Sequence, residues 1–245
     1  MTLANLRYPN PGADLLRIQA KWLAPARARL LRRAAIARRG RVLDLGAGSG
    51  AVTGELVRRA GGAVTALDLA FAVLRADPAA FAGAGRVCAD ALRLPFPSLT
   101  FDLVFCQCAL LWMQPAEVVL DEIARVLRAE GALVALEPDY GGLIEHPPEI
   151  AVRDIWIAAL ARAGADPFIG RKLPGQLEAR GFRVRVDLLP ELRPPDPARF
   201  DFLRGLPLTA GEQTRVEQAA HADAQNSGRA RVAHLPFCLI TAFKT

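Results

Sequence analysis

Long apolar runs and secretion signals are missing from this sequence of 245 residues. The longest apolar candidate, residues 103–113, is interrupted by Gln107 and is shorter than the roughly 18 residues that a membrane-spanning helix needs. The amino terminus has neither a basic segment nor a continuous apolar segment of the secretory type. We therefore expect a cytoplasmic protein without a membrane span.

Cysteine is also scarce, and the four residues all lie in apolar stretches: Cys88, Cys106, Cys108 and Cys238. Isolated cysteines in such stretches are typical of buried thiols, whereas a small secreted domain spaces its cysteines as a disulfide framework. Cys106 and Cys108 form a C-x-C pair, but neither a histidine nor a further cysteine lies nearby in the sequence to complete a metal site. We expect reduced, buried thiols and no metal ion.

Lysine is almost absent, because Lys21, Lys172 and Lys244 are the only ones among 31 basic residues; the formal charge is +6. The basic excess concentrates between Arg17 and Arg41, where nine lysines or arginines stand without an acid. Such a stretch can contact nucleic acid or an anionic membrane, but it can also be the solvated face of amphipathic helices. We expect the solvated helical face and no nucleic-acid partner.

Short strands and helices alternate over the first 140 residues. Helices are expected at 12–24 and 25–38, because proline is favoured in the first turn of a helix and Pro25 can open the second one. The expected strands are residues 41–45, 63–69, 86–89, 101–108 and 132–137, with helices at 51–59, 70–76 and 115–127 between them. This alternation predicts an α/β domain with a doubly wound, mostly parallel sheet and helices on both faces.

The pattern changes beyond Pro138. We expect a helix that follows Pro147 and Pro148 and ends at residue 163, a loop over 164–174 and a further helix that ends at residue 181. Strands are expected at 182–189 and 234–243. The helix between them begins with Thr209 and Glu212, which have the spacing of a capping box.

The most informative segment is VLDLGAGSG, residues 42–50. Glycines at 46, 48 and 50 permit a tight turn and a close approach of the backbone to a ligand, and the next helix begins with unpaired N–H groups. The turn alone is ambiguous, because Gly46, Gly48 and Ala51 also satisfy the G-x-G-x-x-G/A pattern of dinucleotide-binding proteins.

Three acids at strand ends restrict the class of ligand that the glycine turn can bind. Asp44 lies two residues before the first glycine, Asp68 ends the second strand and Asp90 follows the third. The two oxygens of Asp68 can accept hydrogen bonds from both hydroxyls of a ribose. An NAD enzyme would account for Asp68 but has no particular use for Asp44 and Asp90 together, so the acids favour a nucleoside ligand that also carries an amino-acid part.

Four segments carry a resemblance to a known family. They are VLDLGAGSG, ALDLA, CADALRLPFPSLTFDLVFCQCALLWM and RVLRAEGALVALEPD, within residues 41–139. Together they resemble the successive motifs of class I S-adenosylmethionine-dependent methyltransferases of the ubiquinone/menaquinone-methylase-like (methyltransferase type 11) group. The resemblance implies a Rossmann-like sheet of seven strands whose last strand, residues 234–243, is antiparallel. It also implies a single domain over 1–245, with a helical lid (1–40), a cofactor-binding core (41–139) and substrate-side insertions with the last two strands (140–245).

The same resemblance assigns roles to individual positions. Asp44 and the glycine turn would contact the methionine portion of S-adenosyl-L-methionine, and Gln107 would lie beside the transferable methyl group. Asp68 would bind the ribose, while Leu69, Asp90 and Ala91 would border the adenine. The implied cofactor-binding residues are Asp44, Gly46, Ala47, Gly48, Gly50, Asp68, Leu69, Asp90, Ala91 and Gln107.

The acceptor and its activation are less constrained by the sequence. A protonated nucleophile needs a base, and the candidates after the fifth strand are Asp139, Tyr140, Glu145 and His146, of which Tyr140 and His146 are our predicted catalytic residues. We expect methyl transfer to a small organic acceptor by in-line displacement. Two alternatives stay open. The first is a protein of the same fold that methylates RNA or protein or only binds a partner without catalysis. The second is an NAD(P)-dependent oxidoreductase.

Overall fold

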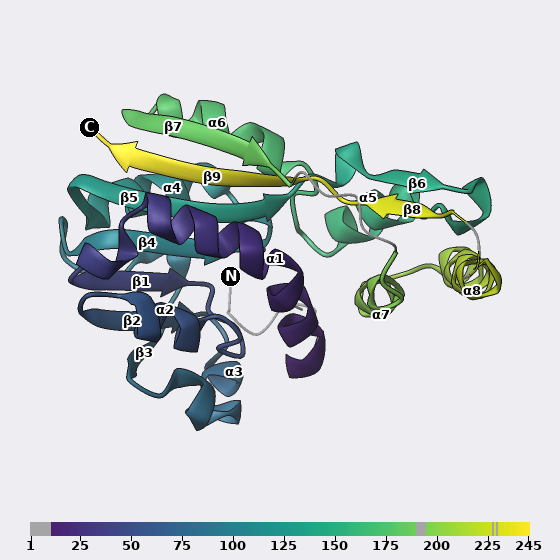
Figure 1. The fold of residues 1–245 in the computed structure, drawn as a ribbon, viewed down its shortest axis with the longest axis horizontal. Coiled ribbons are helices and arrows are strands. Elements are labelled where there is room, and N and C mark those ends of the chain that lie inside the picture. The colour runs from purple at the N-terminus through teal and green to yellow at the C-terminus, as the bar shows by residue number, and fades with distance from the viewer. Residues whose placement is uncertain (1–10, 190–194, 227, 229) are drawn as a thin grey trace.

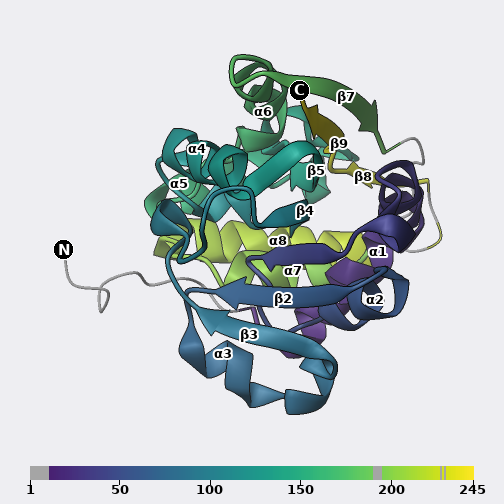
Figure 2. The same cartoon turned by 90° about the vertical axis from the view of Figure 1, so that its left-hand side faces the viewer.

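The computed structural model describes residues 11–189, 195–226, 228 and 230–245, so the first ten residues of the predicted lid lie outside the described part. A sheet of seven strands forms its centre, in the order β3-β2-β1-β4-β5-β9-β7 (Figures 1 and 2). The strands are β1 (Arg41–Leu45), β2 (Ala63–Asp68), β3 (Ala84–Cys88), β4 (Phe101–Gln107), β5 (Leu127–Pro138), β7 (Phe182–Leu188) and β9 (Phe237–Lys244).

The direction of the strands confirms the predicted fold class. β1 to β5 pair in parallel, and β9 runs antiparallel to both of its neighbours, β5 and β7. The predicted last strand at 234–243 is divided, because β9 starts at Phe237 and His234 belongs to a separate short strand. That strand, β8 (Val232–His234), pairs with β6 (Ile144–His146) beyond the carboxyl ends of the large sheet (Figure 1). Three-residue strands leave too short a pattern to be predicted.

Helices cover both faces of the sheet. They are α1 (Ala13–Arg33), α2 (Thr53–Arg59), α3 (Phe71–Ala76), α4 (Ala116–Val126), α5 (Arg153–Arg162), α6 (Ile169–Glu178), α7 (Ala198–Arg204) and α8 (Ala210–Gln225). The first three pack on one face and α4 and α6 on the other, because alternate strand residues such as Val42 and Leu43 point into separate apolar clusters. The capping box of Thr209 and Glu212 at the start of α8 is confirmed.

The prediction of two helices before residue 39 is wrong, because α1 continues through Pro25 as one helix of 21 residues. Leu23 and Leu30, on either side of the proline, are fully buried against the sheet. Proline removes one backbone hydrogen bond and bends a helix, and Figure 1 shows α1 changing direction along its length. Burial on both sides of Pro25 therefore keeps the helix continuous.

The predicted loop over 164–174 is also corrected, since α6 begins at Ile169 and contains Pro174. Gly170 allows this early start: a Cβ at this position would lie 2.8 Å from the carbonyl oxygen of Pro138. The absence of a side chain lets the first turn of α6 pack directly on the end of β5. Ile169 and Leu173 are fully buried there, so tertiary packing overrides the local loop signal.

Burial of all four cysteines was expected, and the structure corrects this for two of them. Cys106 and Cys238 are buried, whereas Cys88 is exposed at the end of the edge strand β3 and Cys108 is half-buried. Within the described ranges, no three histidine, cysteine, aspartate or glutamate side chains gather closely enough to hold a metal ion. None of the helices in the same ranges combines the length and apolarity that crossing a bilayer requires.

Candidate active site

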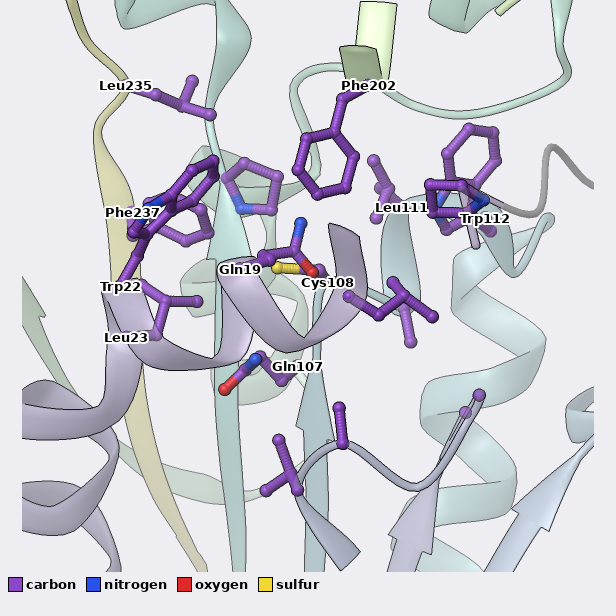
Figure 3. A pocket seen from close by; sticks show the side chains of 18 of the residues that line it. Gln19, Trp22, Leu23, Gln107, Cys108, Leu111, Trp112, Phe202, Leu235 and Phe237 are labelled. Atoms are coloured by element: carbon purple, nitrogen blue, oxygen red, sulfur yellow. The ribbon is translucent and has the colours of Figure 1, made fainter. Parts of the chain in front are cut away.

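A cavity of about 680 Å³ opens at the carboxyl ends of β1, β2 and β4 (Figure 3). Its floor comes from these strand ends and its walls from α1, α5, α7 and β8. The cavity brings together seven of the residues that the sequence singled out, although they are spread over almost one hundred positions: Asp44, Gly46, Ala47, Gly48, Asp68, Gln107 and Tyr140.

The glycine turn is held close to the sheet. The N–H groups of Gly46 and Ala47 both donate to the carbonyl of Leu67, at 2.8 and 3.0 Å. Gly46 has a φ of +73°, and a Cβ there would lie 2.5 Å from the Cβ of Ala109, so glycine is required at this position. Gly48 has a φ of +54°, and a Cβ there would approach only Leu16, at 3.6 Å. The backbone at Gly48 is therefore open to a ligand in the cavity.

Asp68 braces this turn as well as facing the cavity. Its Oδ2 accepts from the N–H of Gly48 at 2.8 Å, and its Oδ1 accepts from the N–H of Ala70 at 2.9 Å. Each carboxylate oxygen can accept more than one hydrogen bond, so both remain able to accept from a ligand hydroxyl. The sequence suggested a ribose-binding role, and the structure adds a second role in holding the glycine turn.

Asp44 is buried beneath the turn. Its Oδ2 accepts from the hydroxyl of Thr53 at 2.6 Å, at the first residue of α2. Burial raises the pKa of Asp44 to about 6, and the nearby carboxylate of Asp68 also raises it. A cationic ligand group placed against Asp44 would favour the ionised carboxylate, which makes this corner of the cavity suited to an ammonium group.

Arg27 is a functional candidate that the sequence analysis missed. Its Nη1 donates to Oε1 of Gln107 at 2.9 Å, while its Nε and Nη2 donate to Oε2 of Glu55 at 2.8 and 2.6 Å. Because arginine has only donors, the carboxamide oxygen of Gln107 faces Arg27, and its amino group remains for the cavity. The signal was present in the sequence, since Arg27 interrupts the apolar spacing of Leu23 and Leu30 on one helix face.

The prediction that residues 17–41 form a solvated helical face is therefore only partly correct. Besides Arg27, which is buried, two further arginines of this stretch pair with acids elsewhere in the chain. Arg17 contacts Asp77 at 3.2 Å, and Arg33 contacts Asp187 at 2.5 Å. Part of the basic charge thus ties α1 to the rest of the domain.

Five of the predicted site residues do not line the cavity: Gly50, Leu69, Asp90, Ala91 and His146. Asp90 accepts from the N–H of Leu92 at 2.9 Å and so caps a short 3₁₀ turn. His146 is exposed on β6, and the histidine that lines the cavity is His234 on the paired strand β8. Sequence position alone could not separate the two histidines, because their placement depends on the pairing of β6 with β8.

Tyr140 lines the cavity beside Trp156, with ring centroids 5.0 Å apart. Only 9% of Tyr140 is exposed, and this burial raises the pKa of its hydroxyl well above the ordinary value. The phenol therefore keeps its proton at neutral pH. In that state Tyr140 can donate a hydrogen bond to a bound molecule but is a poor base.

Glu137 is a second residue that the sequence analysis missed. It is fully buried below the cavity, where its Oε1 accepts from the N–H groups of Ala109 and Leu110, each at 3.0 Å. Among the described residues, its Oε2 has no hydrogen-bond partner. Glu137 thereby braces the turn after β4, which carries Cys108 into the cavity wall.

We expect Glu137→Gln to flatten the pH dependence of stability. Burial raises the pKa of Glu137 to about 7, so between the unfolded value near 4.5 and about 7 the folded state binds more protons. The free energy of unfolding contributed by this group therefore falls as pH rises through that window, by at most about 1.4 kcal/mol per pH unit. Glutamine keeps the carbonyl acceptor for Ala109 and Leu110 and cannot ionise.

Urea unfolding at pH 5, 6, 7 and 8 measures this effect. Glu178→Gln, at an exposed position on α6, is the control and should leave the slope unchanged. Parallel curves for the parent and Glu137→Gln would show that Glu137 does not titrate in this window.

Comparison with known proteins agrees with this geometry. Residues 43–135 match the family model described as a methyltransferase domain. A malonyl-[acyl-carrier protein] O-methyltransferase of Halorhodospira halophila is 44% identical over 98 residues, 38% of this chain and 33% of the relative. A demethylmenaquinone methyltransferase of Thermobifida fusca is 39% identical over 101 residues, 39% of this chain and 42% of the relative. The chain thus matches less than half the length of either relative.

The structural similarity to solved proteins covers more of this chain than the sequence matches do. A putative methyltransferase from Bacillus halodurans superposes with a TM-score of 0.64 at 19% identity, over 89% of this chain and 97% of that one. A geranyl diphosphate C-methyltransferase from Streptomyces coelicolor, solved with S-adenosyl-L-homocysteine, gives a TM-score of 0.57 at 14% identity, over 92% of this chain and 80% of that one. Residues 43–135, which carry the glycine turn and the strand-end acids, therefore match a methyltransferase domain, and the chain has the Rossmann-like methyltransferase fold with its antiparallel β9.

Proposed function

We propose that the chain transfers a methyl group from S-adenosylmethionine to a small organic acceptor by in-line displacement. One observation carries the proposal: a single cavity joins the glycine turn, Asp44, Asp68 and Gln107 to a mainly apolar space. The first group suits a nucleoside with an amino-acid part, and the second suits an acceptor. Both lie at the carboxyl ends of parallel strands, where ligands bind in doubly wound folds.

The residues fit the cofactor by their chemistry. The open backbone at Gly48 admits close approach of the methionine portion, and Asp44 offers a carboxylate for its ammonium group. The oxygens of Asp68 offer acceptors for the ribose hydroxyls. The amino group of Gln107, oriented by Arg27, offers a donor at the end of β4. Leu69, Asp90 and Ala91 remain proposed neighbours of the adenine, although they do not line the cavity.

When bound, S-adenosylmethionine supplies a methyl group that its sulfonium has already activated. The protein then needs to hold the acceptor in line with the methyl carbon and the sulfur, and such positioning can contribute roughly 7–11 kcal/mol. The new bond forms between the acceptor atom and the methyl carbon, and the electrons of the broken C–S bond stay on sulfur. A proton leaves only where the acceptor atom carried one, and His234, which lines the cavity, is then the side chain that we propose receives it.

We expect S-adenosylhomocysteine to raise the melting temperature. At ten times its dissociation constant, a ligand of the folded state adds about 1.4 kcal/mol of stability. For a chain of this length that corresponds to a shift of about 3–6 °C. Differential scanning fluorimetry with S-adenosylhomocysteine and with NADH makes the comparison.

A matched pair of variants controls this measurement. Gly48→Ala places a methyl group in the cavity, whereas Gly164→Ala imposes the same left-handed backbone strain at an exposed position with nothing within 4 Å. We expect Gly48→Ala to lose most of the shift and Gly164→Ala to keep it. A shift with NADH and none with millimolar S-adenosylhomocysteine would overturn the proposed function in favour of an oxidoreductase.

A further inference from the structure

Aromatic side chains surround the part of the cavity that faces the carboxy-terminal segments. We call this part the acceptor chamber and define it by Trp22, Trp112, Tyr140, Trp156, Phe202 and Phe237. Figure 3 shows Trp22, Phe202, Phe237 and Trp112 around one side of the cavity and Gln107 toward the other. The rings of Trp22 and Phe202 lie 5.8 Å apart, so α1 and α7 meet across the chamber.

The chamber is built mainly from segments that the family match does not cover. Only Trp112 falls within residues 43–135; the other five come from α1, from α5, from α7, from β9 and from the turn after β5. The chemistry of the chamber is therefore a property of this chain and cannot be transferred from the matched core of its relatives.

Among the described residues, Asp196 is one of two charged ones that line the chamber side of the cavity, and its carboxylate is already engaged. Its Oδ2 accepts from Nε1 of Trp22 at 2.9 Å, and its Oδ1 accepts from the N–H of Ala198 at 2.9 Å. These bonds attach the start of α7 to α1. Asp196 therefore supports the wall of the chamber, and its negative charge does not favour an anionic ligand.

Arg199 is the second charged residue on the chamber side of the cavity. Acids of the chain compensate its positive charge. Its Nη1 donates to Oε1 of Glu145 at 2.7 Å, and its Nη2 donates to the carbonyl of Ile150 at 3.3 Å. Oδ2 of Asp223 lies 3.9 Å from the same guanidinium. Nε of Arg199 has no hydrogen-bond partner among the described residues, but it is buried. Among the described lining residues, the chamber thus offers a carboxylate or phosphate no arginine or lysine whose charge lacks a nearby acid.

The charged residues at the other end of the cavity also fail to favour an anionic acceptor. Asp44 and Asp68 stand where the cofactor is proposed to bind, and no lysine or arginine among the described lining residues lies at that end to attract an anionic acceptor. An unpaired anion loses its hydration in such a site without a compensating partner. An uncharged ring loses little hydration and gains stacking contacts with the aromatic walls.

Building on the proposed function, we infer that the acceptor chamber takes an uncharged, ring-bearing molecule and discriminates against carboxylates and phosphates. Tyr140 and His234 supply polar atoms that can orient a hydroxyl or carbonyl on such a ring. The aromatic walls then hold the ring while the acceptor atom faces the methyl group.

Two naphthalenes of matched shape test this inference. The chain saturated with S-adenosylhomocysteine is titrated by calorimetry with 2-naphthol and with 2-naphthoate at pH 8. We expect 2-naphthol to bind at least tenfold more tightly. Equal or tighter binding of 2-naphthoate overturns the inference, and so does the absence of 2-naphthol binding at millimolar concentration.

Variants locate the binding to the chamber. Phe202 is half-buried and projects into the cavity, so Phe202→Ala should weaken 2-naphthol binding about five- to tenfold, and Phe202→Leu, which keeps more apolar packing, should weaken it less. Phe71→Ala, at an aromatic residue that is 59% exposed and outside the cavity wall, should change nothing. Equal affinity of Phe202→Ala and the parent would place the ligand elsewhere and overturn the inference.

The experiment distinguishes a failure of this inference from a failure of the proposed function. If S-adenosylhomocysteine fails to bind, the methyltransferase proposal falls, and titration of the ligand-free chain with the two naphthalenes still decides the chemistry of the chamber. If S-adenosylhomocysteine binds and 2-naphthoate is preferred, the proposed function stands and the neutral acceptor is excluded.

Discussion

Arg27→Ala should lower the free energy of unfolding by about 2–4 kcal/mol, because it takes the hydrogen-bond donor away from several buried or half-buried acceptors at once. The Arg27 side chain is 5% exposed, and its guanidinium donates to three groups: the carboxylate of Glu55, the carboxamide of Gln107 and the carbonyl of Ala20. Removing it takes away both hydrogen bonds that it donates to Oε2 of Glu55, whose side chain is only 17% exposed, and leaves Arg59, at 3.0 Å from Oε1, as the ion-pair partner of that carboxylate. Urea unfolding of the parent and the variant at neutral pH measures the difference.

The controls for this prediction separate charge from packing. Arg32→Ala, at an exposed position on the same helix, should change stability by less than about 0.5 kcal/mol. Combining Arg27→Met with Glu55→Gln removes the carboxylate charge that Arg27 paired with and keeps most of the aliphatic volume, so it should recover part of the loss. If Arg27→Ala unfolds like Arg32→Ala, the buried network contributes nothing and Gln107 is not held by it.

Asp68→Ala should weaken S-adenosylhomocysteine binding roughly 10- to 100-fold, because two contributions disappear together. Hydrogen bonds from the ribose hydroxyls to the carboxylate are worth about 1.5–3 kcal/mol each before water replaces part of them. The variant also frees the N–H groups of Gly48 and Ala70, which loosens the turn that shapes the site. Isothermal titration calorimetry measures the change, and we expect the chain to remain folded because Asp68 lies at the cavity surface.

Asp68→Asn tests the charge at nearly constant size. The amide turns one acceptor into a donor, so either Gly48 or Ala70 loses its acceptor, and we expect a loss close to that of Asp68→Ala. Asp77→Ala is a matched control, since Asp77 also accepts from a backbone N–H two residues on, that of Ala79, but does not line the cavity. Parent-like affinity in both Asp68 variants would reduce Asp68 to a strand-end residue.

Local signals account for the parts of the fold that the sequence predicted well. The strand Arg41–Leu45 has its predicted bounds, and the capping box at Thr209 forms as expected. Both depend on residues within a few positions of one another, where backbone preference and apolar periodicity operate. The position of the glycine turn on the sheet edge follows from the same strand–turn–helix order, since right-handed crossovers bring parallel strand ends to one edge.

Predictions failed where distant packing opposed a local signal. Pro25 and Pro174 both indicate boundaries, yet each lies inside a helix that has fully buried leucines in the adjoining turns. The choice between His146 and His234 depended on the pairing of two strands that are each three residues long. In these places the free energy of burial exceeded the preference of a single residue.

The sequence by itself determined the fold class, the glycine turn and the strand-end acids, because each is encoded by short-range spacing. Only the tertiary structure decided that Arg27 reaches Gln107, 80 positions away, and that Glu137 braces the turn after β4. It also decided which aromatic side chains enclose the acceptor chamber. Contacts of this kind join segments that share no sequence pattern, so they arise only when burial of the helices against the sheet brings those segments together.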